Sequence, residues 1–266
     1  GDSLTQNHKV TSVVVESLET PEDVYCLEVD SKEHNFPLGC GIFASNCEGL
    51  SAASGLKAGR KSALHHAVLP LRGKILNVKD ASVDEVMANK EIFTLLNVIG
   101  LGIDQYNVTT GCTNPGEALE KIKRYTRYGK IIIATDADAD GSHIQNLILY
   151  LISRHARFLI DFGLVYILMS PLYEQNGKFF FQGDPIQPGT TFPVGLDPTK
   201  HFRRWKGLGS IPKELVYDVF YNPGTRRLVQ VTPDGIEYFN SLVENIDARK
   251  DLLVKAGILG DPFNLG

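Results

Sequence analysis

Apolar positions along most of the chain follow strand and helix patterns in turn. Residues 131–135 form a continuous apolar run rich in β-branched side chains, which is typical of a strand buried on both faces. Two stretches, 82–99 and 116–128, carry apolar residues at helical spacing. Further strands are expected at 165–173 and 178–182, and further helices at 141–160, 212–220 and 236–254. Strands that alternate with helices predict an α/β fold for this part of the chain.

The first 46 residues differ from the rest of the chain in hydrophobic pattern and in charge. They predict short strands at 10–16, 24–29 and 42–44, separated by turn-forming proline and glycine residues. This segment holds eight acidic and two basic residues, a net charge of −6, whereas the whole chain carries −4 and residues 47–266 therefore carry +2. We infer that the acidic first segment and the mildly basic body have different roles.

Composition excludes several classes of protein. Apolar residues make up 43% and charged residues 22% of the chain, as in ordinary globular proteins. No apolar run approaches the ~18–20 residues of a membrane span, and a secreted precursor is not expected. The cysteines lack zinc-site spacing, and a disulfide framework is not expected in a chain of this length. We therefore expect a cytoplasmic protein with four reduced thiols: Cys26, Cys40, Cys47 and Cys112.

Asn46 and Cys47 form a junction that side-chain chemistry could cut and rejoin. An asparagine amide can attack its own backbone carbonyl and cleave the chain after itself, and a histidine such as His34 can assist by proton transfer. A cysteine directly after the asparagine supplies a nucleophile that can first receive an acyl group. On these few residues alone, an ordinary loop with a loop histidine is the commoner explanation.

The surrounding sequence changes this balance. Residues 24–47, VYCLEVDSKEHNFPLGCGIFASNC, resemble the C-terminal end of an intein, especially of split inteins. The residues that match the family's reacting positions are His34, Ser45, Asn46 and Cys47. The resemblance implies that the asparagine cyclises with help from the histidine and that the cysteine begins the spliced product. Cys26 stands where the family usually has aspartate, which leaves the role of that position open.

Three carboxylates follow the apolar run at 131–135. Asp136, Asp138 and Asp140 alternate in the sequence TDADADG, and such a cluster repels itself unless a cation neutralises it. Hard carboxylate oxygens suit Mg²⁺. An EF-hand is excluded because its twelfth position is Leu147 rather than glutamate, and because a strand precedes the loop. An acidic turn that caps the following helix is the alternative on these residues alone.

Four motifs occur in a fixed order around this cluster. They are EGLSA at 48–52, LPLRGKILNV at 69–78, TDADADGSHI at 135–144 and RWKGLG at 204–209. With the NPGTRR…ENIDARKDLL tail they resemble the TOPRIM region of type IIA DNA topoisomerase large subunits, of the gyrase and T-even phage kind. The resemblance covers residues 48–257, and Leu50 departs from it because the family has aspartate there.

This resemblance implies a site that holds Mg²⁺ against a DNA phosphate while a tyrosine of another subunit attacks. Glu48 and Asp136 would bind one metal ion, and Glu48 would also exchange a proton during religation. Asp138 and Asp140 would bind the second metal ion. Contacts with DNA phosphates are implied for the basic residues of the matching motifs, which are Lys57, Arg60, Arg72, Lys74 and Lys206.

On these patterns the chain has three parts. They are an intein C-terminal fragment over 1–46, a TOPRIM domain over 47–183, and a completion of that domain with the KGLG motif and a helical tail over 184–266. The expected fold is α/β, a Rossmann-like parallel sheet with a C-terminal helical tail, preceded by a small all-β intein fragment. The expected function is that of the Mg²⁺-binding part of an ATP-hydrolysing type IIA topoisomerase, active in DNA cleavage, religation and strand passage after splicing.

The expected partners are double-stranded DNA, an N-terminal half with the ATPase domain and the other intein part, and a tyrosine-bearing subunit. ATP would act only through that N-terminal half, since no ATPase domain precedes the motifs in this sequence. No membrane partner is expected, and a phage-encoded protein of this kind would act in the host cytoplasm. Two alternatives are an inactive truncated topoisomerase with an intein remnant and a non-catalytic DNA-binding module.

The strand that leads into Glu48 is expected to come from another polypeptide. In open α/β sheets the functional groups follow the carboxyl ends of strands, so Glu48 needs a sheet strand directly before it. If the intein fold holds residues 41–47, this segment should not also complete the TOPRIM sheet. The metal site would then be assembled only after ligation.

Overall fold

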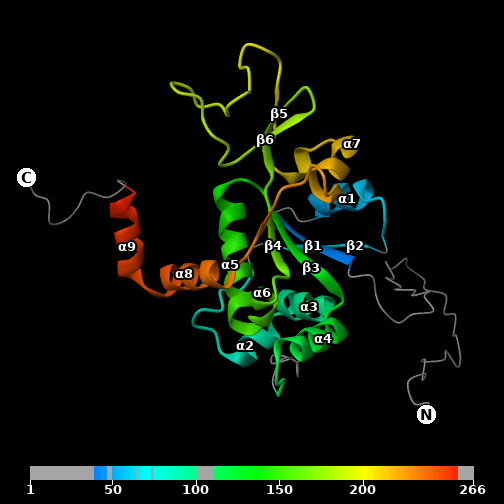
Figure 1. Ribbon diagram of the computed structural model, residues 1–266, viewed down its shortest axis with the longest axis vertical. Helices are drawn as coiled ribbons and strands as arrows, with labels where there is room; N and C mark the ends of the chain where they lie inside the picture. Colours follow the sequence, from blue (N-terminus) through cyan, green and yellow to red (C-terminus); the bar gives the residue numbers. More distant parts are fainter. Residues whose placement is uncertain (1–38, 47–49, 64, 73–74, 101–110, 257–266) are drawn as a thin grey trace, which may run out of the picture. The chain divides into compact units, whose positions relative to one another are not determined.

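The computed structural model describes residues 39–46, 50–63, 65–72, 75–100 and 111–256 (Figure 1). The chain separates into two units, Gly1–Asn35 and Phe36–Gly266, and all of the described residues lie in the second. The strands expected at 10–16 and 24–29 lie outside the described residues. Within the part that is described, one five-stranded sheet and one three-stranded sheet are present.

The larger sheet has the strand order β2-β1-β3-β4-β8. Its strands are β1 (Gly39–Asn46), β2 (His66–Arg72), β3 (Tyr128–Thr135), β4 (Val165–Leu168) and β8 (Leu228–Gln230). Strands β1 to β4 run parallel, whereas β8 is antiparallel to β4. The predicted parallel sheet is therefore confirmed for four strands and wrong for β8. Mixed sheets of this class commonly carry such an antiparallel edge strand.

Strand β3 is buried on both faces, as its apolar run predicts. Ile131 and Ile133 belong to one core cluster, and Ile132 and Ala134 belong to another. All four side chains are 0% exposed. Because successive side chains of a strand point to opposite faces, the two clusters lie on opposite faces of the sheet.

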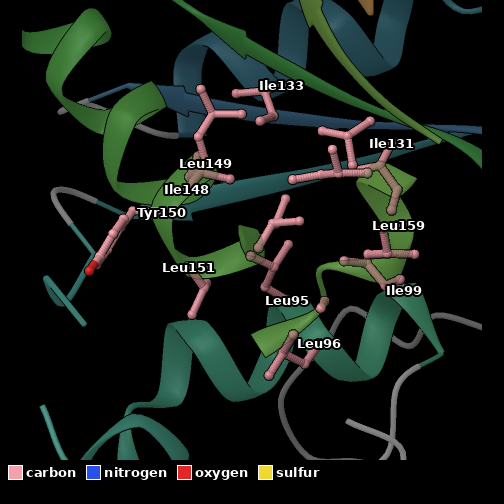
Figure 2. Packing of buried hydrophobic residues seen from close by; sticks show 14 of the residues in the cluster. Leu95, Leu96, Ile99, Ile131, Ile133, Ile148, Leu149, Tyr150, Leu151 and Leu159 are labelled. Atoms are coloured by element: carbon pink, nitrogen blue, oxygen red, sulfur yellow. The ribbon is translucent and has the colours of Figure 1, made fainter. Parts of the chain in front are cut away.

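The first core cluster covers the face that carries Ile131 and Ile133. Figure 2 shows Ile131 and Ile133 of β3 together with side chains of the helices that carry Leu95, Leu149 and Leu159. Burial of such apolar surface contributes roughly 25 cal/mol per Å². Tyr150 lies at the rim of the cluster, where its hydroxyl donates to Glu244 Oε1 at 3.1 Å. The helices of this face include α2 (Val83–Ala88), α3 (Lys90–Ile99), α4 (Pro115–Tyr125), α5 (Ala139–His155) and α6 (Phe158–Asp161).

The second core cluster covers the opposite face of the sheet. Tyr221 is 1% exposed there, and its hydroxyl donates to the carbonyl of Leu56 at 2.7 Å. This bond joins the first helix of the domain to a segment 165 residues later in the chain. The elements of this face include α1 (Leu50–Gly59), η2 (Leu208–Ser210), α7 (Lys213–Val216) and η3 (Tyr217–Tyr221).

Two predicted helices are each divided in the structure by an asparagine. Asn89 has an extended backbone, ends α2, and accepts a hydrogen bond from the Ile92 amide at 3.1 Å as the N-cap of α3. Asn245 likewise separates α8 (Pro233–Glu244) from α9 (Ile246–Lys255). Asparagine competes for backbone amides in this way, which interrupts a helix without interrupting its apolar spacing.

The smaller sheet is antiparallel and has the order β6-β5-β7. Its strands are β5 (Pro171–Gln175), β6 (Lys178–Phe181) and β7 (Arg203–Arg204). The strand expected over 165–173 is therefore two strands, β4 and β5, which belong to different sheets. Helices α8 and α9 confirm the expected helical tail. Among the described residues, no helix has the length and apolar character needed to cross a bilayer.

Candidate metal and DNA site

The carboxyl ends of three parallel strands meet at one edge of the larger sheet. Ser45 of β1 is opposite Thr135 of β3, and Asp136 follows directly. On the other side of β1, Asn46 is opposite Arg72 at the end of β2. Functional groups of open α/β sheets gather at this edge. The acidic cluster predicted from the sequence therefore lies where a ligand site is expected.

The position of β1 corrects one expectation. Residues 41–47 were expected not to complete this sheet, yet Gly39–Asn46 forms an internal strand between β2 and β3. Strand pairing uses backbone amides and carbonyls, which every non-proline residue supplies whatever other fold its sequence resembles. In this chain the strand that precedes Glu48 is therefore already in place.

Asp136 is held by two glycine-containing segments. Its Oδ1 accepts a hydrogen bond from the Leu208 amide at 2.7 Å. A Cβ on Gly207 would lie 2.8 Å from the same oxygen, and a Cβ on Gly141 would lie 2.1 Å from the Asp136 carbonyl oxygen. Only glycine permits both approaches, so Gly141 packs against the backbone of Asp136 and Gly207 of KGLG packs against its carboxylate.

The environment of Asp136 favours a bound cation. Burial raises the pKa of this carboxyl, the Leu208 amide opposes that rise, and the nearby charge of Asp138 adds to it. The net direction is upward, so the ionised form is costly at this position. A cation would offset both the loss of solvent and the repulsion between the two carboxylates.

Asp138 and Asp140 lie at the start of α5. Asp138 is the N-cap, and its Oδ1 accepts from the Gly141 amide at 2.7 Å. The capping alternative is therefore correct for this oxygen, and the helix begins at Ala139 rather than at Gly141 as predicted. Asp140 is exposed in the first turn, where the helix dipole favours negative charge.

The chemistry of these donors fits Mg²⁺. This ion commonly binds one or two protein carboxylates and keeps waters or substrate phosphates as its other ligands. Within the described residues, no group of three or more His, Cys, Asp or Glu side chains could hold a metal ion. The described part thus offers the interacting pair Asp136 and Asp138. Glu48 lies outside it, two residues after the end of β1 in the sequence.

Lys206 is the predicted DNA contact in the segment that binds Asp136. It is exposed and directly precedes Gly207, which packs close to Asp136, and Leu208, whose amide binds that carboxylate. Arg72 is the last residue of β2, at the same edge of the sheet.

Arg60 has a structural contact in addition to its predicted role. Its Nη1 donates to the carbonyl of His66 at 3.0 Å and so joins the end of α1 to the start of β2. A guanidinium has five N–H donors, so this bond leaves others for a phosphate. Lys57 lies in α1 and is half-buried.

Several predicted site residues are not placed. His34, Cys47, Glu48 and Lys74 lie outside the described residues. Ser45 and Asn46 are the last two residues of β1. The structure therefore locates one side of the proposed splice junction, at the end of a strand.

Sequence reasoning missed the residues that position the site through backbone atoms. Leu208 holds Asp136, and the Ser170 hydroxyl donates to the Thr135 carbonyl at 3.1 Å, directly before that aspartate. The KGLG motif was interpreted for its lysine alone. Its paired glycines are a signal for close backbone approach, which could have pointed to Gly207.

Comparisons with known proteins agree with this geometry. Residues 47–162 match the Toprim domain. The chain is 34% identical over 235 residues to the B subunit of DNA gyrase from Synechocystis sp., which covers 86% of this chain and 19% of that protein. It is 37% identical over 215 residues to the gyrase B subunit of Halalkalibacterium halodurans, covering 77% of this chain and 31% of the relative.

A third relative, the gyrase B subunit of Thermotoga maritima, is 37% identical over 199 residues, or 74% of this chain and 29% of the relative. The chain thus spans less than a third of the length of each of these curated relatives.

Proposed function

We propose that this chain, which carries a Toprim region homologous to that of the type IIA topoisomerase DNA gyrase, provides the Mg²⁺-binding part of a DNA cleavage and religation site. One observation carries the proposal. At the carboxyl edge of the parallel strands, the Leu208 amide of the KGLG segment donates a hydrogen bond to Asp136 Oδ1 at 2.7 Å. A structural acidic turn has no need of a second motif, 72 residues later in the chain, that orients one carboxylate.

The residues of this chain would bind and orient rather than attack. Glu48 and Asp136 would hold one Mg²⁺ and Asp138 with Asp140 a second, and the bound ions would neutralise charge that builds on the phosphate. The Leu208 amide fixes the Asp136 carboxylate before the ion arrives, so little reorganisation is needed. The basic residues of the motifs would contact phosphates without regard to base sequence.

The whole enzyme's activity needs partners. The attacking tyrosine would come from another subunit, and ATP hydrolysis from an N-terminal half of this subunit. The assembled enzyme would act on double-stranded DNA and pass one segment through another. The family relationship of the Toprim region supports these assignments.

We also propose that Asn46–Cys47 is a splice junction. The resemblance of residues 24–47 to split-intein ends supports this proposal. A second support is that Asn46 is the last residue of β1, so the bond after it lies at a strand end rather than within a strand. On this proposal the asparagine cyclises, His34 assists, and Cys47 receives the upstream polypeptide.

Metal binding by the full chain tests the first proposal. Mn²⁺, as a paramagnetic substitute for Mg²⁺, is titrated into the parent, Asp136→Asn and Asp138→Asn by electron paramagnetic resonance. We expect Asp136→Asn to weaken Mn²⁺ binding by about 10-fold or more, since it removes a charge from the site. Asp234→Asn, an exposed carboxylate in the first turn of α8, is the matched control and should bind as the parent does. Parent-like binding by both site variants would refute the metal assignment.

DNA cleavage by the ligated, assembled enzyme tests the same site in action. Asp136→Ala or Asp138→Ala should greatly reduce Mg²⁺-dependent cleavage. DNA binding should persist because the basic residues supply most phosphate contacts. Normal cleavage by both variants would show that the carboxylates are not the metal ligands, and binding without any cleavage in the parent would favour a non-catalytic DNA-binding module.

Mass spectrometry tests the splice junction. The full chain is co-expressed with an upstream half that ends in an N-terminal intein fragment. Asn46→Ala should abolish release of the 46-residue fragment, whereas Cys47→Ala should block ligation and still allow some cleavage after Asn46. Normal ligation and fragment release in either variant would refute the assignment of Asn46–Cys47 as an intein splice junction.

A further inference from the structure

Strand β1 is internal to the sheet although it precedes the region that matches the Toprim family. That match begins at residue 47, whereas β1 ends at Asn46. Cys40–Asn46 pairs in parallel with His66–Arg72, and Cys40–Ser45 pairs in parallel with residues of β3. The Toprim domain of this chain therefore uses a strand from the segment that resembles an intein end.

Removal of β1 would divide the sheet. In the described strand order β2 is an edge strand whose single neighbour is β1. Without β1, β2 would be isolated and β3, β4 and β8 would remain together. The unpaired backbone groups of β2 and β3 would then lie inside the domain, where each unpaired group is costly. The position between β2 and β3, which we call the slot, therefore has to be filled by a strand, whichever segment supplies it.

The slot between β2 and β3 requires an uncharged, extended strand rather than one particular sequence. The β3 side chains beside it, from Ile131 to Ala134, are all 0% exposed, and Leu71 of β2 is also 0% exposed. A charged residue in the slot would lose its solvent on both faces. The sequence of β1, GCGIFASN, has no charged residue. Parallel pairing itself needs only backbone groups, so another uncharged, extended segment would fit.

The strand ends at the proposed splice junction. Cleavage after Asn46 would separate β1 covalently from the rest of its own sheet. Ligation to Cys47 would place the last residues of an upstream polypeptide in the same position along the chain. The incoming segment would thus be joined to Cys47, directly after the position that β1 occupies in the sheet.

We propose that the slot between β2 and β3 is a strand-exchange site. In this chain Gly39–Asn46 fills it, and after ligation an uncharged, extended segment that ends the upstream polypeptide replaces it, parallel to both neighbours. The occupancy of the slot by β1 rests on the observed pairing, whereas the replacement step rests on the proposed splicing. The sheet that carries the acidic cluster is then complete both before and after ligation.

Hydrogen–deuterium exchange of the full chain without a partner tests occupancy. Amides of Ile42–Ala44 should exchange within ~10-fold of those of Ile131–Ala134, because one cooperative sheet protects both. Ile42→Pro removes a backbone donor from β1 and should accelerate exchange in Ile131–Ala134 by at least ~10-fold. Val13→Pro, placed in the separate unit Gly1–Asn35, should not. Unprotected Ile42–Ala44 amides, or β3 exchange unchanged by Ile42→Pro, would overturn the proposal.

A pair of matched double variants tests whether the slot accepts another sequence. Ile42→Val with Phe43→Leu keeps an uncharged apolar strand and should leave β3 exchange within ~3-fold of the parent, whereas Ile42→Asp with Phe43→Lys should accelerate it by at least ~10-fold. Amides of β5 and β6, which belong to the smaller sheet, report whether each variant is folded. Equal acceleration by both doubles would overturn exchangeability, and no acceleration by the charged double would overturn occupancy.

These measurements are independent of the proposed function. They need neither splicing nor DNA cleavage, so they test only the occupancy of the slot by β1 and its tolerance of other sequences. A failure of splicing would overturn the replacement step and leave the measured occupancy unchanged. Conversely, an unprotected β1 would overturn the strand-exchange site while the Mn²⁺ titration could still support the metal site.

Discussion

Gly207→Ala is the sharpest perturbation of the site that the structure offers. The added methyl would lie 2.8 Å from Oδ1 and 2.9 Å from Oδ2 of Asp136. Ordinary contacts begin near 3.4 Å, so the carboxylate or the KGLG backbone must move by about half an ångström. Either movement weakens the bond from the Leu208 amide to Asp136, which is 2.7 Å long in the parent.

The size of the effect follows from that bond. Hydrogen bonds to charged groups contribute about 1.5–3 kcal/mol, and we take about 1–2 kcal/mol here because Asp136 is half-buried. For a domain of this size, 1 kcal/mol corresponds to a shift of ~2–4 °C in Tm, so we expect Tm to fall by ~2–8 °C. Loss of a group that orients a metal ligand typically weakens metal binding by ~10–100-fold.

Calorimetry and Mn²⁺ titration of the full chain measure both consequences. Gly55→Ala is the matched control because its added methyl has nothing within 4 Å. That control lies in α1 and should keep parent-like Mn²⁺ binding, with stability unchanged or raised by ~0.5–1 kcal/mol. If Gly207→Ala matches Gly55→Ala in Mn²⁺ affinity and in Tm to within ~1 °C, the inference that KGLG positions Asp136 is refuted.

Three further predictions concern the surrounding fold. Gly141→Ala should lower stability more than Gly207→Ala, because its methyl would lie 2.1 Å from the Asp136 backbone oxygen and a backbone atom cannot rotate away as a side chain can. Circular dichroism and Tm measure the loss, and a Tm near that of the parent would contradict it. Asn89→Ala removes the N-cap of α3 and should cost about 1 kcal/mol in urea denaturation, whereas an unchanged midpoint would show that this cap is dispensable. Burial lowers the pKa of His66, so the unfolded chain binds its proton more readily; stability should fall as pH drops through about 6.5 toward the lower folded-state pKa, and His66→Gln should flatten that slope. An unchanged slope in this variant would show that His66 does not contribute.

Local sequence patterns were sufficient to predict the elements whose apolar spacing is regular. The run at 131–135 identified a strand buried on both faces, and helical spacing found the region of α4. Helix ends were less predictable. Asn89 and Asn245 each divide a continuous apolar stripe, because a cap acts through one side chain and leaves the spacing of its neighbours unchanged.

The α/β class, the acidic cluster after a buried strand and the motifs around it could all be predicted from sequence patterns. These features are local, since apolar period and carboxylate spacing are read within a few residues. Three features came from the folded structure: the bond from the Leu208 amide to Asp136 across 72 residues, the antiparallel edge strand β8, and the internal place of β1 in the sheet. Strand order depends on backbone pairing between distant segments, and backbone groups are alike in nearly every residue.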